Sequence, residues 1–372
     1  MERRECRRHE VATGALGGSA SHASVSRRSR DRRPVLAPVV VAVAAIATAC
    51  GEDSPSVLDP SSGAGRRVEE LWWVVFWISA VAVAVVTAFI LVAVRRRRPD
   101  PGPGEETGPT AARDVDTRPV PWGDRFVVLA GVVVPGGILA GTFVFSLGVL
   151  GDLADPPEDP VLDVEVVAHT WWWEVRYPNG AVTANEIRIP AGETVQLALP
   201  TADVIHSFWV PELQVKKDHI PGSDNRLWLV ADRAGRFRGQ CAEFCGLQHA
   251  HMEFEVVALP PDEFEEWLDR EAEPAVEPQT AEAREGAEIF EASSCAGCHA
   301  IRGTSADGTL GPDLTHLADR DTIGAGLVPL TPVNLADFIT DPQDAKPGVS
   351  MPPTELSPRE VDAVVAYLME LE

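Results

Sequence analysis

The most informative stretch of this chain is Cys241-Ala-Glu-Phe-Cys245-Gly-Leu-Gln-His249-Ala-His-Met252. Within twelve residues it offers two thiols, an imidazole and a thioether. Soft sulfur together with imidazole selects copper or zinc over hard cations. The three residues between the cysteines allow both sulfurs to face one point, where two thiolates can bridge two copper ions. A rigid β scaffold is the support that such a site needs.

Residue types alone leave three other interpretations of this loop. A disulfide between Cys241 and Cys245 suits an exported chain, but it gives no role to His249 and Met252. A structural zinc site normally takes four cysteine or histidine ligands and has little use for methionine. A mononuclear blue-copper site usually has one cysteine. The pattern therefore favours a copper pair.

The residues around the loop have the pattern of short strands. Five segments alternate in polarity or run apolar between turns that contain Pro or Gly: 161–167, 186–189, 194–199, 226–230 and 253–257. Short strands at such close spacing are typical of an all-β sandwich or barrel. The sequence therefore predicts a β domain over residues 160–262.

A second cluster, Cys295-Ala-Gly-Cys298-His299, is the attachment signature of haem c. Each cysteine sulfur can bond one vinyl group, and the histidine can ligate the iron from one side. A thioredoxin-like redox pair and a zinc site are the alternatives. The adjacent histidine, a Met-Pro sequence downstream and an exported location disfavour both.

The other axial ligand of such a haem must come from elsewhere in the chain. Met351 is the candidate, because it lies between prolines in Lys-Pro-Gly-Val-Ser-Met-Pro-Pro (346–353). A Met/His ligand pair raises the reduction potential, as suits an electron carrier. Met369 and His316 are rivals, although Met369 falls in a helix that is expected to pack as core.

The last part of the chain has a helical pattern from residue 281 onward. Ser357-Pro-Arg-Glu360 reads as a capping box with proline at the first helical position, and an amphipathic run follows to residue 371. Residues 271–280 are polar and rich in proline. The sequence therefore predicts a linker over 263–280 and an all-α domain over 281–372.

Two apolar stretches near the front, 71–94 and 126–150, are long enough to span a membrane. They predict a hairpin over residues 66–150. Trp72, Trp73 and Trp77 cluster where an interfacial aromatic belt is expected, and four arginines at 95–98 mark the cytoplasmic end. This orientation puts everything after residue 151 on the outer face.

The front of the chain reads as an export signal over residues 1–50. A basic segment precedes a short apolar run, 35–49, and small residues lead into Cys50. The sequence Ala-Thr-Ala-Cys at 47–50 favours a lipoprotein signal that ends in a lipidated Cys50. An ordinary cleaved signal and a third membrane span are the alternatives.

Charge is distributed unevenly along the chain. Residues 151–372 hold 14 Lys and Arg against 41 Asp and Glu, an excess of 27 negative charges. This argues against binding to nucleic acid, which needs a basic surface. An acidic exported region is suited to a basic soluble partner, and solubility alone would also explain it.

Residues 66–260 resemble cytochrome c oxidase subunit II. The resemblance rests on the cysteine-rich loop, on His-Ser-Phe-Trp-Val-Pro (206–211) and Lys-Asp-His-Ile-Pro-Gly (217–222), and on two spans before a β domain. It implies a cupredoxin-like fold with a binuclear copper centre. It also implies a Mg or Mn ion on the Glu243 side chain, acceptance of electrons at Trp171, and copper ligands at His206, Cys241, Cys245, His249, Met252 and the Glu243 carbonyl.

Residues 281–372 resemble class I cytochrome c, and the two resemblances together imply a specific function. The chain would be subunit II of a prokaryotic haem–copper oxidase in the cell membrane. It would relay electrons from haem c through copper to subunit I, where oxygen is reduced to water with proton translocation. Subunits I and III, and cytochrome c or a quinol–cytochrome c reductase as donor, are the implied partners. A nitric-oxide reductase subunit and a membrane-anchored copper and haem electron-transfer protein are the alternatives.

One departure from the family concerns proton uptake. The family often has a glutamate near the inner end of the second span, where this chain has Val128, and Asp124 is the candidate substitute. His169, His219 and His251 match no ligand position and are expected to be bystanders.

Overall fold

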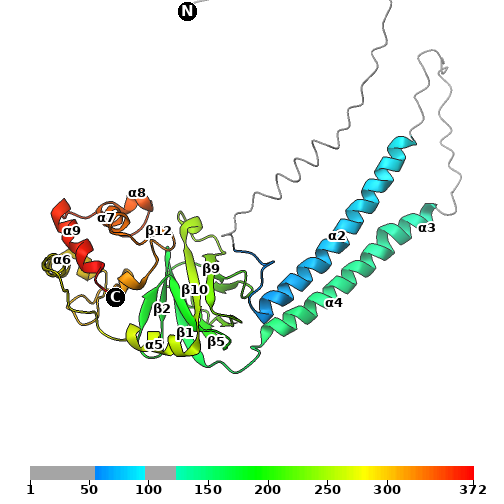
Figure 1. The fold of residues 1–372 in the computed structure, drawn as a ribbon. Helices are drawn as coiled ribbons and strands as arrows, with labels where there is room; N and C mark the ends of the chain where they lie inside the picture. Colours follow the sequence, from blue (N-terminus) through cyan, green and yellow to red (C-terminus); the bar gives the residue numbers. More distant parts are fainter. Residues whose placement is uncertain (1–54, 97–122) are drawn as a thin grey trace, which may run out of the picture. The chain divides into compact units, whose positions relative to one another are not determined.

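The computed structural model describes residues 55–96 and 123–372 (Figure 1). The expected export signal over residues 1–50, including Cys50, lies outside the described residues, as does most of the loop between the two spans. The described chain forms two long apolar helices, then a β-sandwich, then a helical C-terminal region. This order confirms the predicted fold class.

The first long helix is α2 (Gly63–Arg95), of 33 residues. At 1.5 Å per residue it is about 50 Å long, which exceeds the ~30 Å hydrocarbon layer of a bilayer. The Ser62 side chain caps it by accepting a backbone N–H of the first turn. Trp72, Trp73 and Trp77 are exposed near its N-terminal end, as an interfacial belt requires.

The second long helix is continuous over residues 123–154 and runs beside α2 (Figure 1). It consists of α3 (Gly123–Val128), a π-helical turn η1 (Leu129–Val133) and α4 (Val134–Ala154). The wide turn directly precedes Pro135, whose ring would crowd the carbonyl four residues earlier in a regular α-helix. Both long helices are apolar enough to cross a membrane.

The ends of these helices are tied to the β-sandwich. The Ser61 N–H donates to the Glu212 carbonyl at 2.9 Å. The Trp228 indole N–H donates to the Leu153 carbonyl at the end of α4, at 3.2 Å. The sandwich is therefore attached to both helices at one end of the hairpin.

The sandwich contains two five-stranded sheets. The first has the order β3-β2-β1-β5-β8, with bounds β1 (Leu162–His169), β2 (Trp172–Arg176), β3 (Val182–Ala184), β5 (Val195–Ala198) and β8 (Arg226–Leu229). The second has the order β4-β10-β9-β6-β7, with bounds β4 (Glu186–Pro190), β6 (His206–Trp209), β7 (Lys217–His219), β9 (Gly235–Cys241) and β10 (Glu253–Leu259). Pairing is antiparallel except for β1 with β5 and β4 with β10.

Aromatic packing fills the core between the sheets. Phe254 stacks on Phe208 with ring centroids 4.6 Å apart and meets Trp173 edge-on at 5.0 Å. All three side chains are buried. Because β6 and β9 lie side by side in the second sheet, this core supports the two strands that carry His206 and Cys241.

A helix occupies part of the segment that was expected to be a linker. α5 (Pro261–Glu271) buries Phe264 and Trp267 against the sandwich. Trp267 packs edge-on against Tyr177 at 5.2 Å, and the Arg188 guanidinium lies over its ring. The structure therefore begins the linker after residue 271, because these two aromatic side chains give the segment an apolar face.

The C-terminal region is mainly helical, with one small two-stranded sheet. Its elements are α6 (Ala281–Ala292), η3 (Ser294–Gly297), η4 (Leu317–Asp319), β11 (Thr322–Ile323), β12 (Val328–Pro329), α7 (Pro332–Thr340), α8 (Pro342–Ala345) and α9 (Pro358–Leu368). The predicted capping box of Ser357 and Glu360 is present at the start of α9. α6 crosses α9, with Phe290 packed edge-on against Tyr367.

We expect Gly286→Ala to destabilise this region, because a Cβ at Gly286 would lie 1.9 Å from the Ala363 carbonyl oxygen. Alanine gains about 1 kcal/mol of helix propensity over glycine, but forcing two packed helices apart costs about 1–3 kcal/mol or more. The net result is a lower melting temperature of the C-terminal region. Glu285→Ala, at an exposed position of the same helix, is the control. An unchanged melting temperature in Gly286→Ala would contradict this packing.

Candidate functional site

The side chains predicted to bind copper converge from three parts of the sandwich. His206 begins β6, Cys241 ends β9, and Cys245 follows in the loop over residues 241–252, hereafter the copper loop. The nitrogen of His206 and the sulfurs of Cys241 and Cys245 lie within 4.8 Å of one another. All three side chains are buried, so the structure brings a strand residue to a loop that lies 35 residues later.

The donor atoms divide into two sets around the two sulfurs, which are 3.8 Å apart. Cys241 Sγ lies 3.9 Å from His206 Nδ1 and 3.2 Å from the Glu243 carbonyl oxygen. Cys245 Sγ lies 3.6 Å from the Nδ1 atom of His249 and 3.8 Å from the Sδ atom of Met252. Each set holds one imidazole, and each has one further donor, a carbonyl or a thioether. With the two thiols between them, these donors fit two soft metal ions.

The two thiols differ in their acidity. A hydrogen bond from Cys245 lowers the pKa of the Cys241 thiol, and the same interaction, with burial, raises the pKa of the Cys245 thiol. One thiolate therefore forms readily in a buried place. Since the thiolate is the metal-binding form of cysteine, the loop is prepared to take up a cation.

His206 is oriented by a residue that the sequence did not single out. Its Nε2 atom lies 2.8 Å from Asp203 Oδ1. The other carboxylate oxygen of Asp203 accepts hydrogen bonds from the Thr170 backbone N–H at 2.7 Å and from the Thr170 hydroxyl at 2.6 Å. Carboxylates behind metal-binding histidines hold the ring in place and raise its basicity.

We expect Asp203→Ala to lower copper affinity by about 10–100-fold, the usual effect of losing such a carboxylate. The measurement is copper retained by the purified full chain during dialysis against a chelator. Asp224→Ala is the matched control, because the Asp224 side chain is 79% exposed. Equal retention by both variants would show that Asp203 has no part in holding His206.

The Trp171 indole is bonded to the copper loop. Its Nε1–H donates to the Cys245 carbonyl at 3.1 Å. Gly246 follows, at a φ of +124°, and a Cβ there would lie 3.0 Å from the indole. Only glycine allows this close approach, which places Trp171 directly against a predicted copper ligand.

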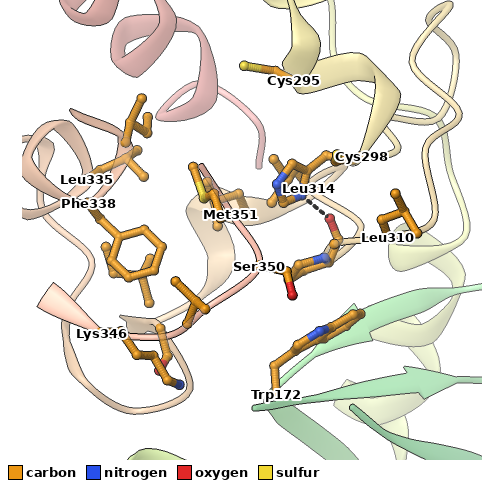
Figure 2. A pocket seen from close by; sticks show the side chains of 18 of the residues that line it. Trp172, Cys295, Cys298, Leu310, Leu314, Leu335, Phe338, Lys346, Ser350 and Met351 are labelled. Atoms are coloured by element: carbon orange, nitrogen blue, oxygen red, sulfur yellow. Dashed lines mark hydrogen bonds between the residues drawn. The ribbon is translucent and has the colours of Figure 1, made fainter. Parts of the chain in front are cut away.

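The predicted haem ligands line one cavity of about 400 Å³ in the C-terminal region, within the usual range for cofactor sites. Figure 2 shows the side chains of Cys295 and Cys298 around the same cavity as the Met351 thioether. His299 lines it as well. Its walls are largely apolar side chains such as Leu314, Leu317, Leu335, Phe338 and Ile339.

The His299 ring is held in one orientation. Its Nδ1 atom lies 2.8 Å from the Pro312 carbonyl oxygen, so Nδ1–H donates there and Nε2 is left to ligate a metal. Burial lowers the pKa of His299, which favours the neutral ring. A Cβ at Gly311 would lie 2.5 Å from the ring, so the Gly-Pro sequence leaves the space the imidazole occupies.

The structure separates Met351 from its rivals. Met351 lines the cavity, and its backbone carbonyl accepts a hydrogen bond from Gln343 Nε2 at 3.1 Å. Met369 and His316 are not among the cavity-lining residues. His316 Nε2 instead lies 3.1 Å from the Glu273 carbonyl oxygen. The cavity thus offers two thiols, one imidazole and one thioether, the donor set that haem c requires.

The remaining sequence candidates lie outside both donor sets. His219 Nδ1 lies 2.8 Å from the Pro200 carbonyl, His169 is 3.0 Å from Glu174, and His251 is 2.7 Å from the Gln248 side-chain oxygen. The Glu243 carboxylate is half-exposed and 3.5 Å from Lys216 Nζ. Asp124 is exposed in the first turn of α3.

Comparison with known proteins identifies the families of both regions that carry the candidate sites. Residues 180–259 match the family described as cytochrome c oxidase subunit II, periplasmic domain, and residues 283–372 match the family described as cytochrome c. Together these matches cover the copper loop and every predicted haem ligand; the first family implies copper and the second implies haem.

Several proteins named cytochrome c oxidase subunit 2 are similar to this chain. That of Alkalihalophilus pseudofirmus is 39% identical over 250 residues, which is 66% of this chain and 70% of the relative. That of Bacillus sp. (strain PS3) is 37% identical over 56% of this chain and 62% of the relative. A solved periplasmic domain of subunit II from Bradyrhizobium japonicum is 29% identical, with a TM-score of 0.30, over 30% of this chain and 94% of the domain. The chain therefore belongs to the cytochrome c oxidase subunit II family, as a membrane-anchored oxidase subunit with a cytochrome c domain at its C-terminal end.

Proposed function

We propose that this chain accepts electrons at a haem c in its C-terminal domain and passes them to a binuclear copper centre. From there they reach subunit I, where oxygen is reduced to water with proton translocation. One observation carries the proposal. Trp171 and Trp172 line the haem cavity, and the indole N–H of Trp171 donates to the carbonyl of Cys245. One side chain thus lies against both donor sets.

The side chains of this chain explain why the relay is suited to electron transfer. When bound, the copper pair and the haem supply one-electron redox chemistry. His206, Cys241, Cys245 and Met252 are buried, so these four side chains are shielded from water, whereas His249 is partly exposed. Asp203 and the sheet hold His206 in one place. Ligands that are held rigidly change little in geometry when charge changes, which keeps the cost of reorganisation low.

We infer the orientation from the arginines at residues 95–98, which mark a cytoplasmic end. The chain then crosses the membrane twice and carries the copper and haem domains on the outer face of a prokaryotic cell membrane. A lipid on Cys50 would sit on the same face. This orientation is tested by labelling intact cells with a membrane-impermeant reagent, which should reach the copper and haem domains.

The partners follow from the same proposal. Subunit I receives the electrons, and subunit III completes the complex. The donor is a soluble cytochrome c or a quinol–cytochrome c reductase, and the acidic outer region favours a basic docking surface on it. The half-exposed Glu243 carboxylate is proposed to bind Mg or Mn at the boundary with subunit I. Asp124 is proposed as the residue for proton uptake, in the place of the family's glutamate.

The test is metal and haem analysis of the full chain, purified with its oxidase partners from membranes. The proposal expects two coppers and one haem per chain. It also expects a paramagnetic-resonance spectrum in which one unpaired electron couples equally to two copper nuclei. One copper, zinc, or a Cys241–Cys245 disulfide would overturn it and leave a membrane-anchored cytochrome c with another role.

A further inference from the structure

A buried lysine joins the haem domain to the copper domain. Lys346 is 2% exposed. Its Nζ atom donates to the Trp171 carbonyl at 2.9 Å and to the Gly324 carbonyl at 2.6 Å. One of these acceptors belongs to each domain. Lys346 also begins the segment over residues 346–351, hereafter the haem-ligand loop, which ends in Met351 (Figure 2).

A second side chain reaches the same loop from the opposite domain. Gln248 is 4% exposed, and its Nε2 atom donates to the Pro347 carbonyl at 2.6 Å. It is adjacent in sequence to His249, the predicted copper ligand. Gln248 therefore connects the copper loop directly to the haem-ligand loop. Lys346 connects the haem-ligand loop to Trp171, whose indole N–H in turn donates to the Cys245 carbonyl of the copper loop.

Close packing accompanies these hydrogen bonds. Gly348 has a φ of +89°, and a Cβ there would lie 3.0 Å from the Leu247 side chain and 3.6 Å from the Trp171 indole. The haem-ligand loop thus touches the copper loop without an intervening side chain. Gly348 and Leu247 are themselves exposed, so shielding from water strengthens the polar contacts at the buried donors, Lys346 and Gln248.

A separate group of contacts fixes the haem domain at a second place. Strands of the copper domain bond to the segment between η4 and β12. The Glu253 N–H donates to the Ala325 carbonyl at 3.1 Å, and the Asp321 N–H donates to the Glu186 carboxylate at 2.9 Å. Arg236 forms an ion pair with Asp321. Two attachment places define an orientation, whereas one would leave rotation free.

Burial of the Lys346 amine costs free energy, so we expect the amine to have a role that offsets this cost. Burial lowers its pKa to about 7, although Cys245 and Glu253 act in the opposite direction. Both the charged and the neutral amine can donate to the two carbonyls. If the domains separated, the Trp171 carbonyl would lose its donor, and such a loss is large when the groups are buried.

We propose that Lys346 and Gln248 are positioning residues that hold the haem-ligand loop against the copper loop, so that the two redox sites keep one fixed separation. This inference rests on the proposed relay, because the fixed separation matters only if electrons pass between the sites. It assigns no direct contact with copper or iron to either residue. Their role is to suppress movement of one loop relative to the other.

The test uses Lys346→Met and Gln248→Met in the full chain, purified with its oxidase partners. Both substitutions keep the side-chain length and remove the donor. Arg359→Met is the control, because Arg359 is an exposed cation at the start of α9. The first readout is amide hydrogen exchange in the copper loop and the haem-ligand loop. The second is the rate of electron transfer from haem to copper after the haem is reduced by a light pulse.

Both interface variants are expected to exchange about tenfold or more faster in the two loops, as for loss of a buried hydrogen bond. Internal electron transfer should slow while copper content, haem content and their spectra remain those of the wild type. Exchange and transfer rates equal to those of Arg359→Met would overturn the inference. If Lys346→Met fails to mature, Gln248→Met decides, because it lies outside the haem domain. Hydrogen exchange tests the contact between the loops and does not require a working relay. A chain without paired copper would refute the proposed function, and the exchange result would still decide this inference.

Discussion

Replacing Cys245 with serine is expected to leave fewer than two coppers per chain and to reduce oxygen consumption at least about 100-fold, beyond the effect of losing an outer-shell partner. Cys245 Sγ lies close to three other donor atoms. It is 3.6 Å from His249 Nδ1 and 3.8 Å from both Cys241 Sγ and Met252 Sδ. A serine hydroxyl is a hard, neutral oxygen that does not replace a thiolate on copper. One substitution therefore removes a ligand from both metal positions.

The measurement combines copper per chain, paramagnetic resonance and oxygen consumption of the purified complex. Haem content is the internal control, because Cys295 and Cys298 belong to the other domain and should still bind it. Met252→Leu is a milder comparison that keeps both thiolates and should retain both coppers. Two coppers with an unchanged spectrum in Cys245→Ser would show that this sulfur does not bridge the metals.

Removing both haem cysteines is expected to unfold the C-terminal domain as well as to abolish haem binding. Without haem, the largely apolar side chains that line the cavity of about 400 Å³ would lose their packing partner and face water, at about 1.5–3 kcal/mol for each side chain that becomes fully exposed. The whole stability of an ordinary domain is about 5–15 kcal/mol. The cofactor is therefore a large part of the core.

The variant is Cys295→Ala with Cys298→Ala in the full chain, and the measurement is protease sensitivity of residues 281–372. The copper content should remain two per chain, because the copper domain has its own core. Cys298→Ala alone is the graded control, since one thioether bond can still form. A protease-resistant C-terminal domain that contains no haem would contradict this account of its stability.

The sequence could propose cofactor sites where the candidate ligands lie close together along the chain. The copper loop and the Cys295–His299 motif each occupy a few residues, so residue type and spacing carry the chemistry. His206 was placed by resemblance to a family, because it lies 35 residues from Cys241. Asp203 and Lys346 were not found at all. Each acts through a partner that is distant in sequence, and no local pattern reports such a contact.

The fold was predicted best where polarity alternates over several residues. The expected strands at 161–167, 186–189, 194–199, 226–230 and 253–257 correspond to β1, β4, β5, β8 and β10. β3 and β7 have only three residues, too few to show a period, and β6 does not alternate, because its first three residues are all buried. β9 alternates with Arg236 and Arg238 exposed and Phe237 buried, and α5 has apolar residues three apart, so signals for both were present.

The contact between Gly246, Gly348 and the Trp171 indole also bears on how such proteins can change over generations. Two glycines from different domains approach one ring, at 3.0 Å and 3.6 Å for the Cβ atoms they lack. A side chain gained at Gly348 would disturb the copper domain, because it would meet Leu247 and Trp171 there. A side chain gained at Gly246 would displace the Trp171 ring, against which the C-terminal domain packs. The cytochrome domain occupies its own part of the chain, but the surface that contacts the copper domain is complementary to that particular copper domain. Exchange of this domain between related oxidases by recombination should therefore succeed only when the segment around residue 348 and the copper loop are inherited together.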